Sequence, residues 1–236
     1  MVQALKLGSL YLDGKSIAPE AKYQPGQAIS FGETLSDMAI SWVPVNGLLI
    51  ADRCLLTNVS WDDLDAQGLV SGKEITVQGF RFKIRLLKVG SEDNVTNEWD
   101  AALDTVGEDD ALWHWHGQYF WGQESVSGVA SRRAYRGYNS ARYWGWDGSS
   151  YRFAILGFRP ALEPLPTDPA ALRQGQEALI IGRASVVMGS FMDATDYDLV
   201  IQPNADGCVG EVSFAAKIQD GTLAVDRSRI ISIATA

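Results

Sequence analysis

Alternation between apolar and charged side chains is strongest at residues 80–86. Apolar residues hold every second position and basic residues fill the gaps: Phe80, Phe82, Ile84 and Leu86 against Arg81, Lys83 and Arg85. A period of two matches a β-strand, whose successive side chains point to opposite faces. Gln78-Gly79 stands just before this segment and predicts a tight hairpin turn within residues 74–87. The chain must therefore build an antiparallel sheet with one face covered and one face in water.

Further turn signals indicate many short strands. Asp13-Gly14 follows an apolar stretch, and Asn46-Gly47 separates two apolar stretches, as in two-residue hairpin turns. Strand-like segments also recur after residue 176, with turn residues between them. No period of 20–50 residues repeats, so the sequence gives no sign of a repeat protein.

Two segments have the start signals of a helix. Residues 60–67 begin with Ser60 as N-cap, carry acidic residues in the first turn and stop at Gly68. Residues 97–104 begin with Asn97 as N-cap. Together with the strands, they predict an α+β fold of short antiparallel strands and two helices, followed by a small all-β segment.

Composition changes divide the chain into three predicted parts. Residues 1–35 form an N-terminal β arm, residues 36–165 the main domain, and residues 166–236 a small β domain or assembly segment. The region from Pro160 to Pro169 contains four prolines and is predicted to be a stiff connector.

Charge and composition narrow the possible partners and location. The net charge of -9 argues against general nucleic-acid binding. No apolar run approaches the roughly 18 residues of a membrane span, and the N-terminus does not resemble a signal peptide. Cys54 and Cys208 do not make a disulfide framework, which favours a reduced setting. We expect no membrane insertion, no cofactor, and a location in the bacterial cytoplasm or in a virion.

The stretch from Trp113 to Pro164 is the candidate binding region. It contains five of the eight tryptophans and six arginines, and residues 131–159 include a single acid, Asp147. Aromatic rings and arginines are enriched at binding hot spots, and few carboxylates are near enough in sequence to neutralise these arginines. The predicted ligand-binding residues are Arg132, Arg133, Tyr135, Arg136, Tyr138, Arg142, Tyr143, Trp144, Trp146, Tyr151 and Arg152. We expect long loops at residues 122–133 and 135–150. Trp144 and Trp146 are as compatible with closing the core as with an exposed binding loop.

A short motif near the end of this stretch resembles a known family. Gly157-Phe158-Arg159-Pro160-Ala161-Leu162 is similar to the closing motif of bacterial and phage C-type lectin-like modules, including the variable proteins of diversity-generating retroelements. Asn97-Glu98-Trp99-Asp100 stands where such modules have a tryptophan-bearing helix. The resemblance implies a ligand face built from residues just before the motif, about 135–152. It also implies that Arg159 braces loops by bonding to carbonyls.

Two departures separate the chain from better-known members of that fold. Glu163-Pro164 is followed by Leu165, and Trp146-Asp147 by Gly148, so the motifs of calcium-dependent sugar binding are incomplete. Cys54 and Cys208 lie outside the region that holds the cysteines of formylglycine-generating oxidases.

Two smaller clusters have alternative interpretations. If His114 and His116 lie on a strand, they share one face and could bind a metal together with Glu124 or Asp110. The alternative, which we favour, is that both histidines face water or a loop carbonyl. Four acids, Asp193, Asp196, Asp198 and Asp206, lack calcium-loop spacing and predict a solvated turn.

These observations favour a binding protein without enzymatic activity. We expect a phage or prophage component, virion- or tail-associated, that presents the aromatic and arginine-rich surface to a receptor, surface glycan or protein and forms homo-oligomers. An alternative is a protein that sequesters a small anionic, nucleotide-like signal. A third hypothesis is a metal-assisted hydrolase that uses His114 and His116.

Overall fold

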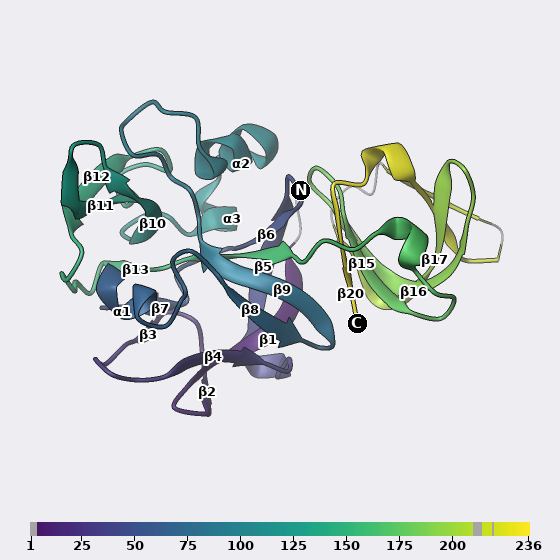
Figure 1. Cartoon of the computed structure of the whole chain (residues 1–236), viewed down its shortest axis with the longest axis horizontal. Coiled ribbons are helices and arrows are strands. Elements are labelled where there is room, and N and C mark those ends of the chain that lie inside the picture. Colours follow the sequence, from purple (N-terminus) through teal and green to yellow (C-terminus); the bar gives the residue numbers. More distant parts are fainter. Residues whose placement is uncertain (1–3, 210–213, 219) are drawn as a thin grey trace.

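A computed structural model describes residues 4–209, 214–218 and 220–236. Figure 1 shows two lobes: a larger one that ends with β14 (Pro160–Pro164) and a smaller one that begins with β15 (Glu177–Ile181). Strands account for 48% of the structure and helices for 12%, with three α-helices in the described part of the chain. The predicted α+β class with two helices is therefore wrong, because most segments expected to be loops are strands.

The first sheet of the larger lobe has the strand order β2-β1-β5-β6-β14-β9-β8, with β4 paired to β1. Besides β14, its strands are β1 (Leu5–Leu12), β2 (Lys15–Ile17), β4 (Ile29–Gly32), β5 (Ala39–Val45), β6 (Leu48–Ala51), β8 (Lys73–Val77) and β9 (Phe80–Leu86). The closing motif runs into β14, which lies between β6 and β9. The first half of the expected proline-rich connector is thus a strand inside the sheet.

The three predicted hairpin turns are confirmed. Gln78-Gly79, Asp13-Gly14 and Asn46-Gly47 each connect paired strands, and all six residues have positive φ between 49° and 83°. Such angles define the turn whose twist matches that of the flanking strands. The alternation at residues 80–86 is also confirmed for its apolar half, since Phe80, Phe82, Ile84 and Leu86 are buried.

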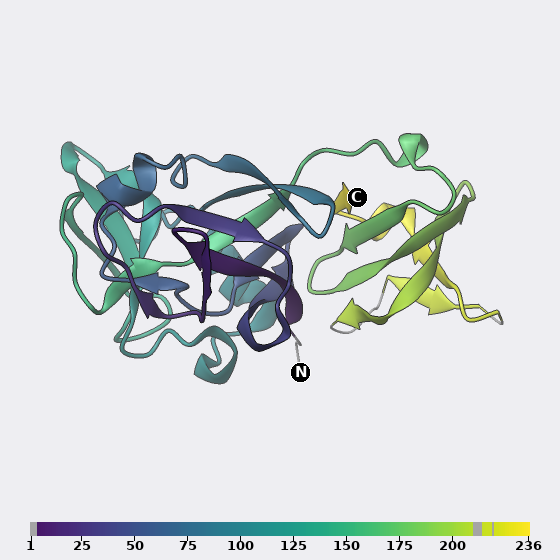
Figure 2. The same ribbon diagram turned by 90° about the horizontal axis from the view of Figure 1, so that it is seen from below.

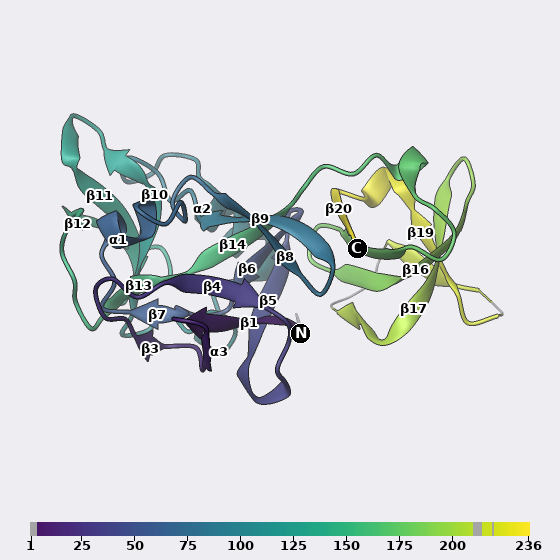
Figure 3. The same cartoon turned by 60° about the horizontal axis from the view of Figure 1, so that its bottom comes forward.

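The second sheet of the larger lobe corrects the predicted loops. Its order is β12-β11-β10-β13-β7-β3. The strands are β3 (Ala21–Lys22), β7 (Leu56–Thr57), β10 (Tyr119–Val126), β11 (Val129–Gly137), β12 (Trp144–Gly148) and β13 (Leu156–Phe158). Residues 122–133 are therefore largely strand, whereas half of residues 135–150 are strand and 138–143 form the loop between β11 and β12. They escaped prediction because β11 is partly exposed and rich in arginine, with Tyr135 as its single aromatic residue. β10, β11 and β12 lie at the end of the larger lobe that is farthest from the smaller lobe (Figure 1 and Figure 3).

Both helix-start predictions are confirmed. α1 (Trp61–Asp65) has Ser60 as N-cap in a reciprocal capping box with Asp63, and α2 (Glu98–Val106) is capped by Asn97. The third helix, α3 (Asp110–Trp113), was not expected. It ends where His114 adopts a left-handed conformation, so the predicted strand through the two histidines is wrong. Short 3₁₀ turns occupy η1 (Ser36–Met38), η2 (Pro169–Ala171) and η3 (Arg227–Arg229).

The smaller lobe is a single sheet with the order β18-β19-β17-β16-β15-β20. Besides β15, its strands are β16 (Val186–Ala194), β17 (Asp198–Val209), β18 (Ala215–Lys217), β19 (Leu223–Asp226) and β20 (Ser232–Thr235). It packs directly on the larger lobe. Asn46 N donates to Arg183 O at 2.8 Å and Ser232 Oγ to Gly47 O at 2.6 Å. Figure 2 shows the connecting segment crossing from one lobe to the other.

A tryptophan-rich core packs between α2 and the second sheet. The Trp99 ring of α2 meets Trp113 and Phe120 edge-on, at centroid distances of 4.9 and 4.8 Å. Trp99 Nε1 also donates to Ala141 O at 2.7 Å, so this large ring keeps its polar atom satisfied. The packing fixes one face of β10 and β11 and leaves the opposite face for other contacts. Within the described ranges, no helix combines the length and apolar character needed to cross a membrane.

Candidate functional site

Four tyrosine rings gather on the second sheet of the larger lobe. The Tyr119 ring lies 4.6 Å from that of Tyr135, 4.7 Å from that of Tyr138 and 5.8 Å from that of Tyr143, measured between centroids. The pair Tyr119–Tyr138 is stacked, with an interplanar angle of 20°. We call these four side chains the tyrosine face. Strand register brings Tyr119 and Tyr135 together: Tyr119 pairs with Gly137, and Tyr135 stands two residues earlier on β11, so both rings lie on the same face.

Glycines make room for the rings. A Cβ atom on Gly145 would lie 2.5 Å from Cε2 of Tyr135, so the Tyr135 ring rests on bare backbone. Tyr138 has a φ of +70°, which is uncommon for a bulky residue. Its N–H is nevertheless held by Trp115 O at 2.9 Å, and its carbonyl accepts from Gly117 N at 3.1 Å. Such an imposed conformation is typical of functional sites, where surrounding bonds maintain local strain.

The tyrosine face is only partly open to solvent, because the Tyr119 and Tyr135 rings pack against the core. None of the four hydroxyls has a hydrogen-bond partner among the described residues, and Tyr143, at 38%, is the one member of the face that is exposed rather than half-buried. Burial, then the neighbouring Tyr143, Tyr119 and Asp147, raises the pKa of Tyr135 to about 12. Burial, then Tyr143 and Tyr138, also raises the pKa of Tyr119. Both hydroxyls therefore keep their protons at neutral pH and can donate as well as accept.

Exposed apolar residues continue from this face along the segment that follows β12. Tyr151 is 52% exposed, Phe153 44% and Ile155 43%. The Tyr151 and Phe153 rings meet edge-on at 5.9 Å, and Ile155 O accepts from Tyr119 N at 2.7 Å. Only Ile155 is tied to the tyrosine face, through its carbonyl; the predicted Tyr151 packs on Phe153 and has no ring contact with the four tyrosines.

The predicted arginines divide into three groups. Arg136 is buried and braces the core: its guanidinium donates to Val89 O, Arg142 O and Asp100 Oδ2. Burial lowers its pKa despite Asp100, yet an arginine stays charged at any physiological pH. Its donors are directed at protein atoms, so the structure gives Arg136 a bracing position below the surface.

Two further arginines are held by carboxylates from distant parts of the chain. Arg142 pairs with Asp104 at 2.7 Å and also contacts Glu108 and Asp100. Arg152 makes two bonds to Asp63, at 2.8 and 2.7 Å. Burial alone would raise the pKa of Asp63, but the bonds from Arg152 and Ser60 outweigh it and lower that pKa. An incoming anion would have to compete with these carboxylates.

The last two arginines lie over tryptophan rings. Arg132 Cζ is 3.5 Å from the centroid of the Trp146 ring, which is 41% exposed. Arg133 Cζ is 4.1 Å from that of Trp61, and its Nη1 donates to Ser125 Oγ at 3.0 Å. Trp144, by contrast, packs on the tryptophan-rich core and donates to Gly90 O at 3.0 Å. Of the two predicted tryptophans, Trp146 is exposed and Trp144 is partly buried.

The histidines do not converge on a metal site. His114 Nε2 is 3.0 Å from Arg53 Nη2, and its Nδ1 is 3.9 Å from Asp52 Oδ2. Glu124 is engaged elsewhere, accepting from Val89 N, and Asp110 accepts from His116 N. In the part of the chain that the structure describes, no three His, Cys, Asp or Glu residues are grouped to hold an ion.

Arg159 and Cys54 are buried beneath the sheets. Arg159 Nη2 donates to His114 O at 3.2 Å, which confirms the expected bond to a carbonyl. Its guanidinium also lies over the Trp99 and Phe120 rings, at 5.1 and 4.7 Å. Burial raises the pKa of the Cys54 thiol to about 11 in spite of Arg159, so this thiol is not a ready nucleophile.

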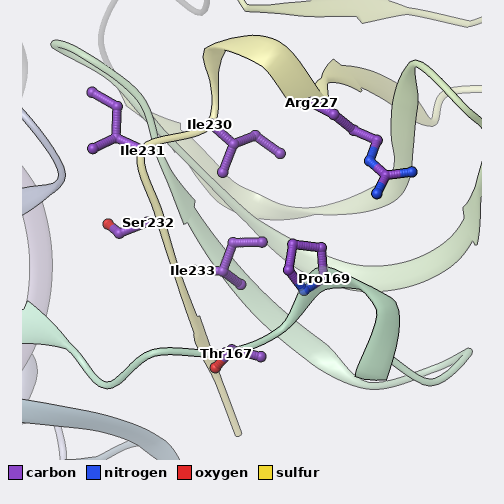
Figure 4. A pocket seen from close by; sticks show the side chains of 7 residues that line it. All are labelled: Thr167, Pro169, Arg227, Ile230, Ile231, Ser232 and Ile233. Carbon is purple, nitrogen blue, oxygen red and sulfur yellow. The ribbon is translucent and has the colours of Figure 1, made fainter.

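The smaller lobe contains two surface hollows. One of about 310 Å³ is lined mainly by isoleucines and Pro169, with Arg227 at one side (Figure 4). Another of about 420 Å³ is lined by Asp196, Asp198 and the 79% exposed Tyr197, among others. Asp193 to Asp198 thus form an exposed hairpin end; the side chain of Asp206 lies outside the described residues.

The larger lobe is therefore a mostly β scaffold with a tyrosine face at its far end. Tyr119 is the member that sequence reasoning missed. The one signal for it is the pairing of β10 with β11, which places the Tyr119 ring against the predicted Tyr135, Tyr138 and Tyr143. Comparisons of the chain with protein-family models, curated proteins and solved structures find no match.

Proposed function

We propose that this chain is a binding protein without catalytic activity, and that the tyrosine face contacts its ligand. The observation that carries the proposal is the set of four packed rings with unpartnered hydroxyls. Tyrosine supplies a large, rigid contact area at low entropic cost, together with a hydroxyl for hydrogen bonding. Arg132 on Trp146 extends this surface with a cation and a second type of ring.

The ligand that fits best is a receptor on a bacterial surface, either a glycan or a protein. The closing motif resembles that of phage and bacterial C-type lectin-like modules, and the resemblance implies a ligand face at about residues 135–152. Three of the four tyrosines fall in that range. A phage or prophage component of this kind would display the far end of its larger lobe and use its smaller lobe for assembly.

The nucleotide-sequestering alternative gains no support from three of the five predicted arginines. Phosphate recognition relies on guanidinium groups with free donors. Arg136, Arg142 and Arg152 already bond to Asp100, Asp104 and Asp63. We therefore favour an uncharged or weakly charged surface ligand.

Binding to cells and glycans tests the proposal. Fluorescently labelled protein is applied to intact bacteria and to a printed array of bacterial surface polysaccharides. We expect binding to at least one of them, weakened about thirtyfold by Tyr143→Ser, the effect of a hot-spot loss of ~2 kcal/mol. Tyr197→Ser is the matched control, because Tyr197 is more exposed but lies on the other lobe. Equal losses in both variants, or no binding to either target, would contradict the proposal.

A further inference from the structure

A pocket of about 250 Å³ lies between α2 and the first sheet, on a part of the larger lobe separate from the tyrosine face. Its floor is apolar and its rim is charged. The lining residues are Val45, Asn46, Leu48, Ile50, Arg85, Glu98, Ala101, Ala102 and Glu163. Asn46 Nδ2 donates to Ala101 O at 3.3 Å, which ties the β5–β6 turn to α2 and closes one side.

The rim has one more negative than positive charge. Buried Arg85 donates to both oxygens of Glu98 at 2.8 Å and, through Nε, to Glu163 Oε2 at 2.7 Å. Burial works against the charged form of Arg85, but Glu98 and then Glu163 outweigh it and raise its pKa. Two carboxylates thus flank one guanidinium.

The bonds around Arg85 leave one carboxylate oxygen free. Glu98 Oε2 accepts a further bond from Lys88 N at 3.0 Å, so both Glu98 oxygens are engaged. Glu163 Oε1 has no partner among the described residues, and the side chain is 45% exposed. Lys83 lies opposite Glu163 in the sheet register, but its side chain covers Gly72 and makes no ion pair with Glu163 within 4 Å. An anion entering the pocket would find four of the five Arg85 N–H donors already bonded, whereas a cation would find a free acceptor.

We propose that this pocket binds a small organic cation, a primary alkylammonium. Its ammonium group donates to Glu163 Oε1, and its hydrocarbon body lies on Leu48, Ile50 and Ala101. Charge-assisted hydrogen bonds are the stronger class, and an apolar floor removes the hydrocarbon from water. Arg85 acts as a positioning residue, since it holds both carboxylates in place. The inference is independent of the tyrosine face and of any ligand bound there.

Titration with n-hexylamine tests it at neutral pH and low salt. Backbone amide resonances are followed by NMR, with hexan-1-ol as the neutral analogue of the same length. We expect saturable shifts at Val45, Leu48, Ala101 and Ala102, at least about tenfold weaker with hexan-1-ol. Shifts confined to other regions, or equal affinity for amine and alcohol, would overturn the proposal.

Three variants separate charge recognition from a general loss of structure. Glu163→Gln keeps an acceptor for Arg85 but removes the charge, and we expect hexylamine affinity to fall about tenfold or more. Glu74→Gln is the matched control, because Glu74 also pairs with an arginine, Arg81, but lies outside the pocket. Ala101→Leu should block the pocket. If Glu163→Gln and Glu74→Gln weaken binding equally, the site is wrong, whether or not Ala101→Leu folds.

A second ligand distinguishes free amines from protein lysines. The probe is a capped Gly-Lys-Gly tripeptide titrated under the same conditions. Weaker binding than hexylamine supports a small free amine as the occupant. Tighter binding that Glu163→Gln abolishes would support the same ammonium chemistry with a lysine side chain as its source. Binding of the tripeptide that survives Glu163→Gln would overturn recognition by this carboxylate.

Discussion

Arg136 Nη2 lies 2.8 Å from Asp100 Oδ2, and this contact joins β11 to α2 beneath the candidate binding surface. The Arg136 side chain is 2% exposed, while that of Asp100 is 23% exposed. The same guanidinium bonds to Val89 O and Arg142 O, so one side chain connects four segments. A single buried charge thereby holds the second sheet on its helical support.

The first prediction follows from that burial. Arg136→Ala should lower the free energy of unfolding by about 3–5 kcal/mol, because it leaves the Val89 and Arg142 carbonyls without their guanidinium donor and removes the buried partner of Asp100. Arg142→Ala is the comparison, since Arg142 also contacts Asp100 but is 39% exposed; its cost should stay below about 1 kcal/mol. Urea unfolding followed by tryptophan fluorescence measures both. Similar losses in the two variants would show that Arg136 is not the brace described here.

A second prediction concerns the glycine under the tyrosine face. Gly145→Ala should lower stability by about 1–3 kcal/mol and displace the Tyr135 ring, because the new Cβ would lie 2.5 Å from it. Gly148→Ala on the same strand is the control, as its nearest contact would be an ordinary 3.4 Å. Near-ultraviolet circular dichroism reports the tyrosine environment. An unchanged spectrum in Gly145→Ala would count against a ring resting on the backbone.

The Tyr135 hydroxyl should make stability depend on alkaline pH. Its pKa is raised from 10.0 to about 12 in the folded protein, first by burial and then by Tyr143, Tyr119 and Asp147. The folded state therefore holds this proton more tightly than the unfolded chain. The resulting contribution to stability is complete below about pH 10 and is lost as pH rises toward 12. Unfolding at pH 9 and 11.5 measures it, and Tyr135→Phe should lose less stability over that interval than the unchanged protein.

The sequence predicted what short-range chemistry decides. Ser60 and Asn97 cap helices, and three two-residue turns form, because their partners lie within a few positions. The arginines were misjudged for the opposite reason. The carboxylates that pair with them are distant in sequence: Asp63 is 89 residues from Arg152, and Asp100 is 36 residues from Arg136.

The strands of the second sheet were hidden by their own composition. β11 contains three arginines and one tyrosine; one of its arginines is buried, while its first three residues are exposed. The hydrophobic pattern of this segment therefore predicts a polar loop, because an arginine counts as polar in the pattern even where its guanidinium is buried among protein acceptors. The tyrosine face required the register of β10 on β11, which no local pattern specifies.

The two cysteines give a final prediction about burial. Cys54 is buried, and burial raises the pKa of its thiol to about 11, whereas Cys208 is exposed. At pH 8 a thiol-specific disulfide reagent should label one thiol per native chain, because only Cys208 is accessible. Cys208→Ser should reduce native labelling to near zero, and urea should then expose Cys54 and restore one thiol. Rapid labelling of Cys54 in the folded Cys208→Ser variant would mean that the region beneath the closing motif opens to solvent.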